Sequence, residues 1–348
     1  MTSPNSNMAA MKTRVLGLDI GGANLKAANT DGNALTRPFQ LWKQPRRLPA
    51  ALTRLLRRFP PFDRLAVTMS GELCDCFASR SDGVRAILDA VETASTARAV
   101  QVWQSDGRLV SMETARSRPL QVASANWLAL ATFAGRFAPR GPALLVDIGS
   151  TTTDIVPLVD GQPQPQGRTD LERLQAQELV YIGSARTPLF ALLSSVALRN
   201  QPVWLIPELF ATSKDVLLTL GWHPESEADR ETADGAPATR RHARARIARH
   251  FGADDDMLTA DEVLAICESA KELLLQRIAK AVSAVACRIT AKAPTVISAG
   301  SGELLVEMTI RGLEWTSQRV SLGEKLGPEL STAAPAYAVA VLASEFHR

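Results

Sequence analysis

The sequence predicts an α/β protein built from two related lobes, and three observations support this prediction. The chain of 348 residues is long enough for two domains that each bury a core. Hydrophobic residues make up 46% and charged residues 22%, a composition typical of globular proteins. A short motif occurs twice, and strand-like and helix-like segments alternate along the rest of the chain.

The repeated motif places an aspartate and a glycine after an apolar run in each half of the chain. Residues 16–28 read LGLDIGGANLKAA, and residues 144–156 read LLVDIGSTTTDIV. Four positions are identical, with Leu16, Asp19, Ile20 and Gly21 matching Leu144, Asp147, Ile148 and Gly149. An apolar run, a tight turn with glycine and a second apolar run predict a β-hairpin. Two such hairpins favour a duplicated domain.

The remaining elements alternate in chain order. The first half predicts strands at 65–68 and 99–103 and helices at 83–94 and 122–137. The second half predicts strands at 201–206 and 294–298 and helices at 213–220, 259–292 and 332–346. Thr259 and Glu262 have the spacing of a capping box at the start of the long helix.

These elements give a domain organisation with four parts. We expect a flexible leader at 1–11, a first lobe at 12–140 and a second lobe at 141–330. The C-terminal helix, within 331–348, is expected to pack back on the first lobe. Residues 223–258 are polar and predict an insert or lid in the second lobe.

Composition excludes several classes of protein. The net charge of +3 does not indicate a nucleic-acid or membrane-surface binder. Residues 1–10 lack the apolar segment of a signal peptide, and no run of 18 apolar residues predicts a membrane helix. The four cysteines lack the spacing of a metal site, so we expect ordinary thiols and a cytoplasmic location. A homo-oligomer stays open.

The first turn carries groups that suit a phosphate ligand. Glycine in a tight turn leaves backbone N–H groups accessible to phosphate oxygens. The predicted phosphate-binding residues are Gly21, Gly22, Asn24 and Lys26. Asp19 precedes the turn and is a candidate Mg²⁺ ligand, directly or through water.

The second turn carries hydroxyl groups in place of the second glycine. Its predicted phosphate-binding residues are Gly149, Ser150, Thr151 and Thr152. Asp147, the second candidate Mg²⁺ ligand, forms a carboxylate pair with Asp154; such a pair facing a phosphate needs a cation, or one member acts as a base. Aspartate–glycine turns also occur in hairpins that bind nothing, but two copies and the hydroxyl run favour phosphate binding.

A third turn, Gly300-Ser301-Gly302, follows a predicted strand and opens a helix. Backbone at a helix N-terminus can approach a ligand closely. We predict that these residues bind a nucleotide or a substrate, although such a turn also occurs as an ordinary strand-to-helix connection.

The order of the three turns resembles that of the acetate and sugar kinase, Hsp70 and actin (ASKHA) superfamily. A closer resemblance is carried by residues 18–26 (LDIGGANLK), 67–73 (VTMSGEL), 125–127 (ANW), 147–154 (DIGSTTTD), 181–188 (YIGSARTP) and 232–235 (TADG). Together these motifs resemble hydantoinase/oxoprolinase-related proteins linked to tetrahydromethanopterin one-carbon transfer. Archaeal relatives of that family are methanofuran-biosynthesis synthases.

The resemblance implies two duplicated lobes around a phosphate-binding cleft and an unusual use of that fold. The implied reaction joins an aminomethylfuran-methyl diphosphate to the phenol of a glutamyl-tyramine, or of tyrosine in the methylofuran of methylotrophic bacteria. It forms an aryl ether and releases diphosphate, with Mg²⁺ as the implied cofactor. A carboxylate then accepts the phenolic proton, for which Asp19, Glu72 and Asp154 are candidates.

The matched motifs also imply substrate-binding residues. These are Ser70, Asn126, Arg186 and Asp234. Ser70 stands where relatives often have threonine, which keeps the hydroxyl. The stretch 170–178 has no clear match, so no role is carried onto it.

Other interpretations remain beside this one. The arginine-rich run at 240–249 is typical of a solvated helix face, or of a lid that meets an anionic substrate. An ATP-dependent small-molecule kinase, a non-catalytic ATP-binding assembly protein and an ATP-dependent amide-ring opener share the fold. Whether ATP binds at all is therefore open.

Overall fold

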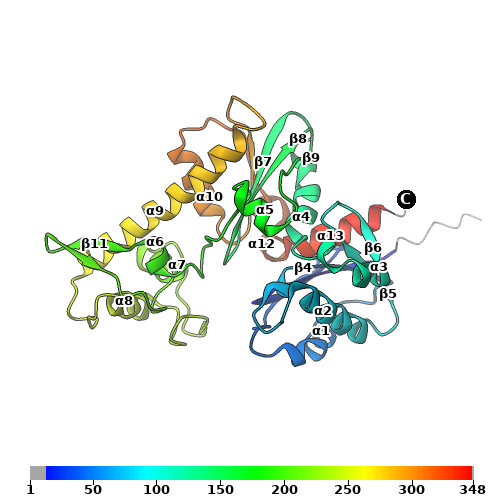
Figure 1. Ribbon diagram of the computed structural model, residues 1–348, viewed down its shortest axis with the longest axis horizontal. Coiled ribbons are helices and arrows are strands. Elements are labelled where there is room, and N and C mark those ends of the chain that lie inside the picture. Colours follow the sequence, from blue (N-terminus) through cyan, green and yellow to red (C-terminus); the bar gives the residue numbers. More distant parts are fainter. Residues whose placement is uncertain (1–12, 347–348) are drawn as a thin grey trace, which may run out of the picture. The chain divides into compact units, whose positions relative to one another are not determined.

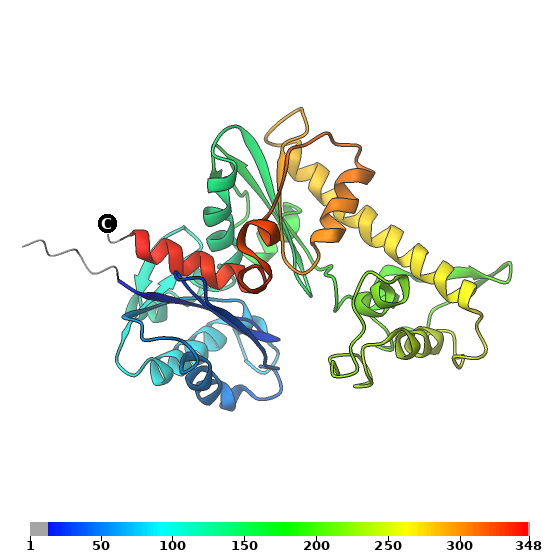
Figure 2. The same ribbon diagram turned by 180° about the vertical axis from the view of Figure 1, so that it is seen from behind.

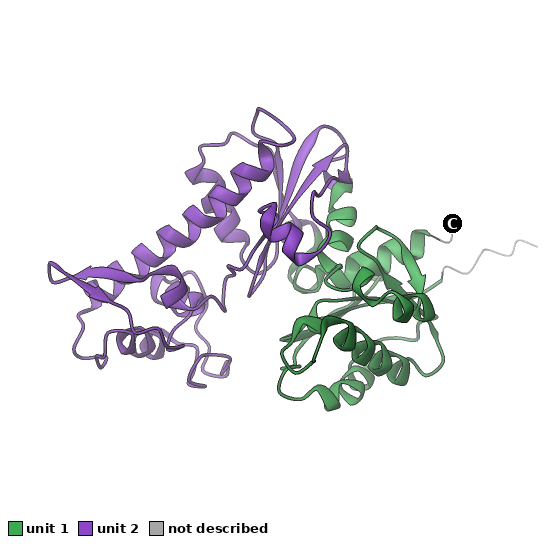
Figure 3. Ribbon diagram, viewed as in Figure 1, with its two compact units in different colours: residues 1–136, 326–348 green, residues 137–325 purple. Residues whose placement is uncertain are grey.

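The computed structural model describes residues 13–346, which divide into two compact units (Figure 3). Unit 1 combines the chain up to residue 136 with the chain from residue 326, and unit 2 comprises 137–325. The sequence-based lobe boundaries were 140/141 and 330/331. The leader expected at 1–11 lies outside the described residues.

Unit 1 contains a six-stranded sheet in the order β3-β2-β1-β4-β5-β6. The strands are β1 (Val15–Ile20), β2 (Asn24–Asn29), β3 (Ala34–Pro38), β4 (Arg64–Met69), β5 (Ala99–Trp103) and β6 (Leu109–Ser111). β1 is buried at every position, and it runs antiparallel to β2 and parallel to β4. This central place explains its continuous apolar run.

Helices cover both faces of this sheet. They are α1 (Leu48–Leu56), α2 (Arg80–Ser95), α3 (Met112–Ser117), α4 (Asn126–Ala134), α12 (Pro328–Thr332) and α13 (Ala334–Glu345). Figures 1 and 2 show α1 and α2 on one face and α13 on the other. α13 packs so closely on β1 that a Cβ at Gly17 would overlap the carbonyl oxygen of Ala336. A glycine is therefore required where this helix crosses the strand.

Unit 2 repeats the arrangement of the unit 1 sheet. Its order is β10-β8-β7-β13-β14, with β9 paired to β8. The strands are β7 (Pro142–Ile148), β8 (Thr153–Val159), β9 (Gln162–Pro163), β10 (Leu179–Val180), β13 (Thr295–Ala299) and β14 (Arg319–Ser321). In both units a hairpin is followed by two parallel strands, β4–β5 in one and β13–β14 in the other. The predicted pair of hairpins is confirmed.

The helices of unit 2 divide into two groups. α5 (Asp170–Gln175), α10 (Glu303–Gly312) and α11 (Leu322–Leu326) lie beside the sheet. α6 (Leu189–Leu192), α7 (Ser213–Leu220), α8 (Arg240–Arg249) and the hairpin β11 (Ser195–Leu198)–β12 (Gln201–Trp204) gather at the N-terminal half of α9 (Ala260–Ala286) (Figure 1). α9 thus connects the sheet with this second group, which we call the insert.

Local signals explain several element boundaries. The capping box of Thr259 and Glu262 is confirmed at the start of α9. In the described part of the chain, 3₁₀ turns lie at Pro45–Arg47, Gly71–Leu73, Pro119–Gln121 and Gly135–Phe137. No helix within residues 13–346 combines the length and the apolar character needed to cross a membrane.

Four element predictions need correction. The helix expected at 259–292 ends at Ala286. The helix expected at 122–137 is shorter, since Ser124 has a φ of 46° and α4 starts only at Asn126. The strand expected at 201–206 ends at Trp204 and belongs to the separate two-stranded sheet. The arginine-rich helix α8 is not fully solvated, because Arg246 is 0% exposed. Its guanidinium contacts the carboxylate of Asp215, which is also buried.

Candidate active site

The first candidate site is the turn between β1 and β2 in unit 1. The backbone N–H of Gly21 donates to the carbonyl of Asn24 over 3.0 Å, which closes the turn. The chain after β4 lies against it, because the N–H of Ser70 donates to the carbonyl of Ile20. A Cβ at Gly71 would lie 3.1 Å from that same carbonyl oxygen. We call residues 19–26 and 70–72 the unit 1 cluster.

The unit 1 cluster holds one neutralised carboxylate. Asp19 is 3% exposed and lies directly across the hairpin from Lys26. The Lys26 Nζ is 3.8 Å from the Asp19 Oδ2, and the lysine side chain keeps 28% of its surface exposed. The predicted phosphate-binding residues of this turn are thus close together, with a cation next to the aspartate.

Glu72 lies in this cluster but is fully buried. Its Oε1 accepts hydrogen bonds from the Ser124 Oγ over 2.7 Å and from the Arg80 Nη2 over 3.3 Å. The Arg80 Nη2 also donates to the Ser124 Oγ. A carboxylate at 1% exposure held by these two partners is suited to fixing the loop. Its predicted catalytic role stays a prediction, which this burial does not favour.

The Ser124 contact brings the chain before α4 to Glu72. Asn126 starts α4, and its Oδ1 accepts a hydrogen bond from the N–H of Trp127 over 3.0 Å. Asn126 is half-buried, whereas Trp127 belongs to the buried core. Asn126 therefore stays a candidate substrate-binding residue next to the unit 1 cluster.

The second candidate site is the turn between β7 and β8 in unit 2. The N–H of Gly149 donates to the carbonyl of Thr152 over 2.9 Å, as in the first turn. The segment 183–186 wraps around it: the N–H of Ser184 donates to Gly149 and that of Arg186 to Ser150. The exposed Arg186 is thereby placed directly beside the predicted phosphate-binding turn.

The third predicted turn joins the second. The N–H of Gly302 donates to the carbonyl of Ile148 over 2.9 Å, and the hydroxyls of Ser301 and Ser184 are 2.8 Å apart. Gly300 has a φ of 85°, and a Cβ there would overlap the Asp147 carboxylate. We call residues 147–154, 183–186 and 300–302 the unit 2 cluster. The structure thus brings three separate predicted segments together.

Asp147 and Asp154 are direct cross-strand partners, so both side chains point to one face of the hairpin. The Asp154 Oδ1 lies 2.8 Å from the Nη1 of Arg173, which is 1% exposed. Burial raises the pKa of Asp154, and the charge of Arg173 opposes that shift. Sequence reasoning missed Arg173. The available signal was the capping box of Thr169 and Glu172, which predicts a short helix there.

The carboxylate pair fits one kind of metal ion. Within the described part of the chain, no group of three or more His, Cys, Asp or Glu side chains is arranged to hold a metal by itself. Mg²⁺ in phosphate sites takes one or two carboxylates, with phosphate oxygens and water as the other ligands. Asp147 and Asp154 match this donor set as a cross-strand pair, with Arg173 beside Asp154, whereas the cross-strand partner of Asp19 is Lys26.

Asp234 lies in the insert rather than in either cluster. Its Oδ1 is 3.1 Å from the Arg246 Nη1, and its Oδ2 is 3.2 Å from the Arg249 Nη1. These ion pairs hold the loop before α8 to that helix. Its predicted role in substrate binding stays a prediction, while its contacts favour a structural role.

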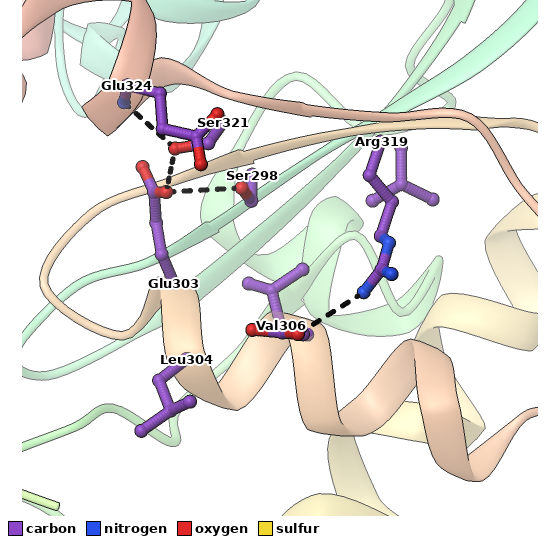
Figure 4. A pocket seen from close by; sticks show the side chains of 9 residues that line it. Ser298, Glu303, Leu304, Val306, Arg319, Ser321 and Glu324 are labelled. Carbon is purple, nitrogen blue, oxygen red and sulfur yellow. Dashed lines mark hydrogen bonds and ion pairs between the residues drawn. The ribbon is translucent and has the colours of Figure 1, made fainter.

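A cavity of about 470 Å³ lies between β13, α10 and β14 (Figure 4). Glu303, the residue after the third turn, accepts hydrogen bonds from the hydroxyls of Ser298 and Ser321 and from the N–H of Gly323. These contacts tie β14 and the start of α11 to α10. They fix the helix that begins immediately after Gly302.

Comparison with known proteins identifies the family. The model of the hydantoinase/oxoprolinase family matches residues 63–345, most of the chain. The protein belongs to the hydantoinase/oxoprolinase family. Among solved structures, nucleotide-free acetone carboxylase matches with a TM-score of 0.52 and 10% identity, covering 94% of this chain and 70% of that one. The duplicated sheets and this likeness show the ASKHA fold expected from the sequence.

Two curated relatives carry a more specific name. The (4-{4-[2-(gamma-L-glutamylamino)ethyl]phenoxymethyl}furan-2-yl)methanamine synthase of Methanocaldococcus jannaschii is 33% identical over 336 residues, which are 95% of this chain and 98% of that relative. The protein of the same name from Methanococcus vannielii is 33% identical over 57% of this chain and 89% of that relative. Both relatives are synthases by name.

Proposed function

We propose that this protein is a transferase of methylofuran or methanofuran biosynthesis. It joins an aminomethylfuran-methyl diphosphate to the phenol of tyrosine, tyramine or a glutamylated form, and it releases diphosphate. The observation that carries the proposal is the similarity to the Methanocaldococcus jannaschii synthase along nearly the full length of both chains. The name of that relative describes a phenoxymethyl-furan, which contains the ether bond in question.

The unit 2 cluster supports a role in holding the leaving diphosphate. Its turn combines backbone N–H groups with the hydroxyls of Ser150 and Thr151, all of them donors that suit phosphate oxygens. A Mg²⁺ ion held by Asp147 and Asp154 would neutralise negative charge on the diphosphate. Stabilising the charge that develops on a leaving group is commonly the largest contribution to catalysis.

The proposed reaction needs no reactant besides the furan diphosphate and the phenol. The bond between the furan methylene carbon and the diphosphate oxygen breaks, and the ring oxygen of the furan stabilises the resulting cation. The phenol oxygen then forms the new bond to that carbon. The phenolic proton passes to a carboxylate, for which Asp19, Glu72 and Asp154 are the candidates, and the contacts of Glu72 with Ser124 and Arg80 make it the least favoured of the three.

This reaction would belong to tetrahydromethanopterin-linked one-carbon metabolism of the kind that methylotrophic organisms use. The partners that we propose are the two small-molecule substrates, without nucleic acid or a membrane. The cytoplasm is the proposed compartment.

Product analysis tests the proposal directly. Purified protein is mixed with Mg²⁺, the aminomethylfuran-methyl diphosphate and each phenol in turn, and the ether is followed by mass spectrometry together with released diphosphate. We expect ether and diphosphate in equal amounts. Calorimetry with ATP and with diphosphate is run in parallel. Tight ATP binding with phosphoryl transfer and no ether would replace the proposal by a kinase function.

A further inference from the structure

Arg173 is placed against the second hairpin by a segment that leaves β8 and returns to it. β10 pairs with β8 so that Leu179 lies opposite Asp154, which brings the end of this segment to the carboxylate. α5, capped by Thr169, carries Arg173 in its last turn. The arginine is 1% exposed although most of α5 faces solvent. The segment therefore buries two charged side chains, Arg173 and Glu178, and Arg173 is the one that contacts Asp154.

Two contacts fix the plane of the guanidinium. Its Nη1 contacts the Asp154 Oδ1 at 2.8 Å, and its Nη2 donates to the backbone carbonyl of Glu178 over 2.9 Å. The side chain of Glu178 is itself held, by the N–H groups of Gln166 and Gly167 and by the Arg288 Nη2 at 2.6 Å. The position of Arg173 is thus set by a buried network.

The backbone near Arg173 has one residue in an unfavourable conformation and one position where only glycine fits. Gln177 has a φ of 57°, a conformation that residues other than glycine rarely adopt. A Cβ at Gly167 would lie 2.5 Å from the backbone nitrogen of Arg173, so only glycine fits. Burying an ion pair is itself weak evidence for stability. An unfavourable backbone conformation near Arg173 and the buried ion pair of Arg173 with Asp154 together indicate a functional constraint.

Comparison with the unit 1 cluster indicates that Arg173 supplies the cation beside the hairpin carboxylate. There Lys26 stands directly across the hairpin from Asp19 and neutralises it. In unit 2 the equivalent cross-strand position is Asp154, so the lysine is replaced by a second carboxylate. The cation comes instead from α5, behind Asp154. Two carboxylates can then face a ligand side by side while one of them is held from behind.

We propose that Arg173 is a positioning residue, which holds the Asp154 carboxylate beside Asp147 so that the pair binds the cation accompanying a diphosphate ligand. This inference rests on the proposed function, because it assumes that the unit 2 cluster receives a diphosphate with Mg²⁺. A lysine cannot replace Arg173 fully, since one ammonium group lacks the planar fork that reaches Asp154 and Glu178 together.

Ligand affinity provides a test that does not depend on turnover. The affinity of full-length protein for Mg²⁺ with diphosphate is measured by calorimetry for the wild type, Arg173→Ala and Arg173→Lys, and for Arg168→Ala as the exposed control from the same segment. We expect Arg173→Ala to weaken binding about 10- to 100-fold, as losing the partner of a metal-binding side chain typically does. Arg173→Lys should fall between, and Arg168→Ala should bind like the wild type.

Chemical rescue separates positioning from a general role in folding. Millimolar guanidinium ion should restore binding to Arg173→Ala, whereas urea at the same concentration should not. If Arg173→Ala does not fold, Arg173→Lys decides, and wild-type affinity in that variant overturns the proposal. Unchanged affinity in Arg173→Ala, or equal rescue by urea, also overturns it. A wild-type protein that binds no diphosphate would instead overturn the proposed function, and this inference with it.

Discussion

The two hairpin turns share one backbone arrangement and differ in their charges. Gly21 and Gly149 close equivalent turns with hydrogen bonds of 3.0 and 2.9 Å. In unit 1 an aspartate and a lysine face each other across the hairpin, Asp19 before the turn and Lys26 after it. In unit 2 the equivalent pair consists of two aspartates. Duplication has kept the hydrogen-bond frame, and divergence has made one turn neutral and the other acidic.

A second difference concerns the segment that packs against each turn. The N–H of Ser70 and that of Gly302 donate to equivalent carbonyls, those of Ile20 and Ile148. In unit 2 the N–H groups of Ser184 and Arg186 donate to the carbonyls of Gly149 and Ser150, whereas in unit 1 those of Phe39 and Leu41 donate to the carbonyls of Ala23 and Gly22. Both turns are thus held by a neighbouring segment, which follows β3 in unit 1 and β10 in unit 2.

The largest effect is expected from removing the charge that distinguishes the turns. Asp154→Asn keeps the shape of the side chain but lowers the negative charge beside Asp147, so we expect turnover to fall about 100- to 1000-fold. Lys26→Gln removes the cation of the neutral turn and should cost about 5-fold, since a partly exposed ion pair is worth up to about 1 kcal/mol. Rates of ether formation at saturating Mg²⁺ measure both. Equal losses would mean that the charge difference has no functional meaning.

Packing gives the next largest effect. Gly300→Ala places a Cβ where φ is 85° and where it overlaps Asp147, so we expect a loss of about 2–4 kcal/mol in the free energy of unfolding. Gly71→Ala meets mainly the flexible end of Leu41, at 2.8 Å, and should cost about 1 kcal/mol. Urea denaturation measures both. A larger loss for Gly71→Ala would reverse the ranking of the two turns.

A smaller effect is expected at the position after each turn. Leu25 packs in the core of unit 1, whereas its equivalent Thr153 is buried and donates to the carbonyl of Ile182 over 2.7 Å. Thr153→Val leaves that carbonyl without this donor, so we expect a loss of about 1–2 kcal/mol. Thr151→Val, at an exposed position of the same turn, is the control and should be nearly neutral. If Thr153→Val does not change the free energy of unfolding, the segment 182–186 does not depend on this hydrogen bond.

How much the sequence could predict follows from the range of the contacts involved. The hairpins, the glycine turns and the start of α9 were predictable because each depends on residues a few positions apart. The partners of Glu72 were not, since Ser124 lies 52 positions along the chain. Arg246 in α8 is similar: its buried partner Asp215 is 31 positions away, so its side chain looks like one more solvated arginine of the run.

The candidate site shows the same limit at Arg173. The sequence predicts both carboxylates of the acidic turn from the repeated motif, because the motif is local. The cation that accompanies Asp154 comes from a helix that reaches it only through the pairing of β10 with β8. Strand pairs of two residues carry almost no periodic signal, so the partner of the carboxylate could not be assigned.

The smallest effect is expected in the insert, which among the described residues belongs to unit 2 alone. His250 in the insert is fully buried; its Nε2 accepts the N–H of Ala211, so the Nδ1–H donates to the carbonyl of Ile206. Burial lowers the pKa of His250 from its usual value near 6.5. The unfolded chain therefore binds the extra proton first, and stability should be complete above about pH 6.5 and fall as the pH drops toward the lowered pKa.

Thermal denaturation between mildly acidic and neutral pH measures this dependence, with His250→Gln as the comparison. Glutamine can accept from Ala211 and donate to Ile206 but does not titrate. The melting temperature of His250→Gln should therefore fall less steeply with acidification than that of the wild type. Parallel curves would assign the acid sensitivity to other groups. Since neither hairpin turn contains histidine, such a component of acid unfolding would report on the insert and leave the comparison of the two turns unaffected.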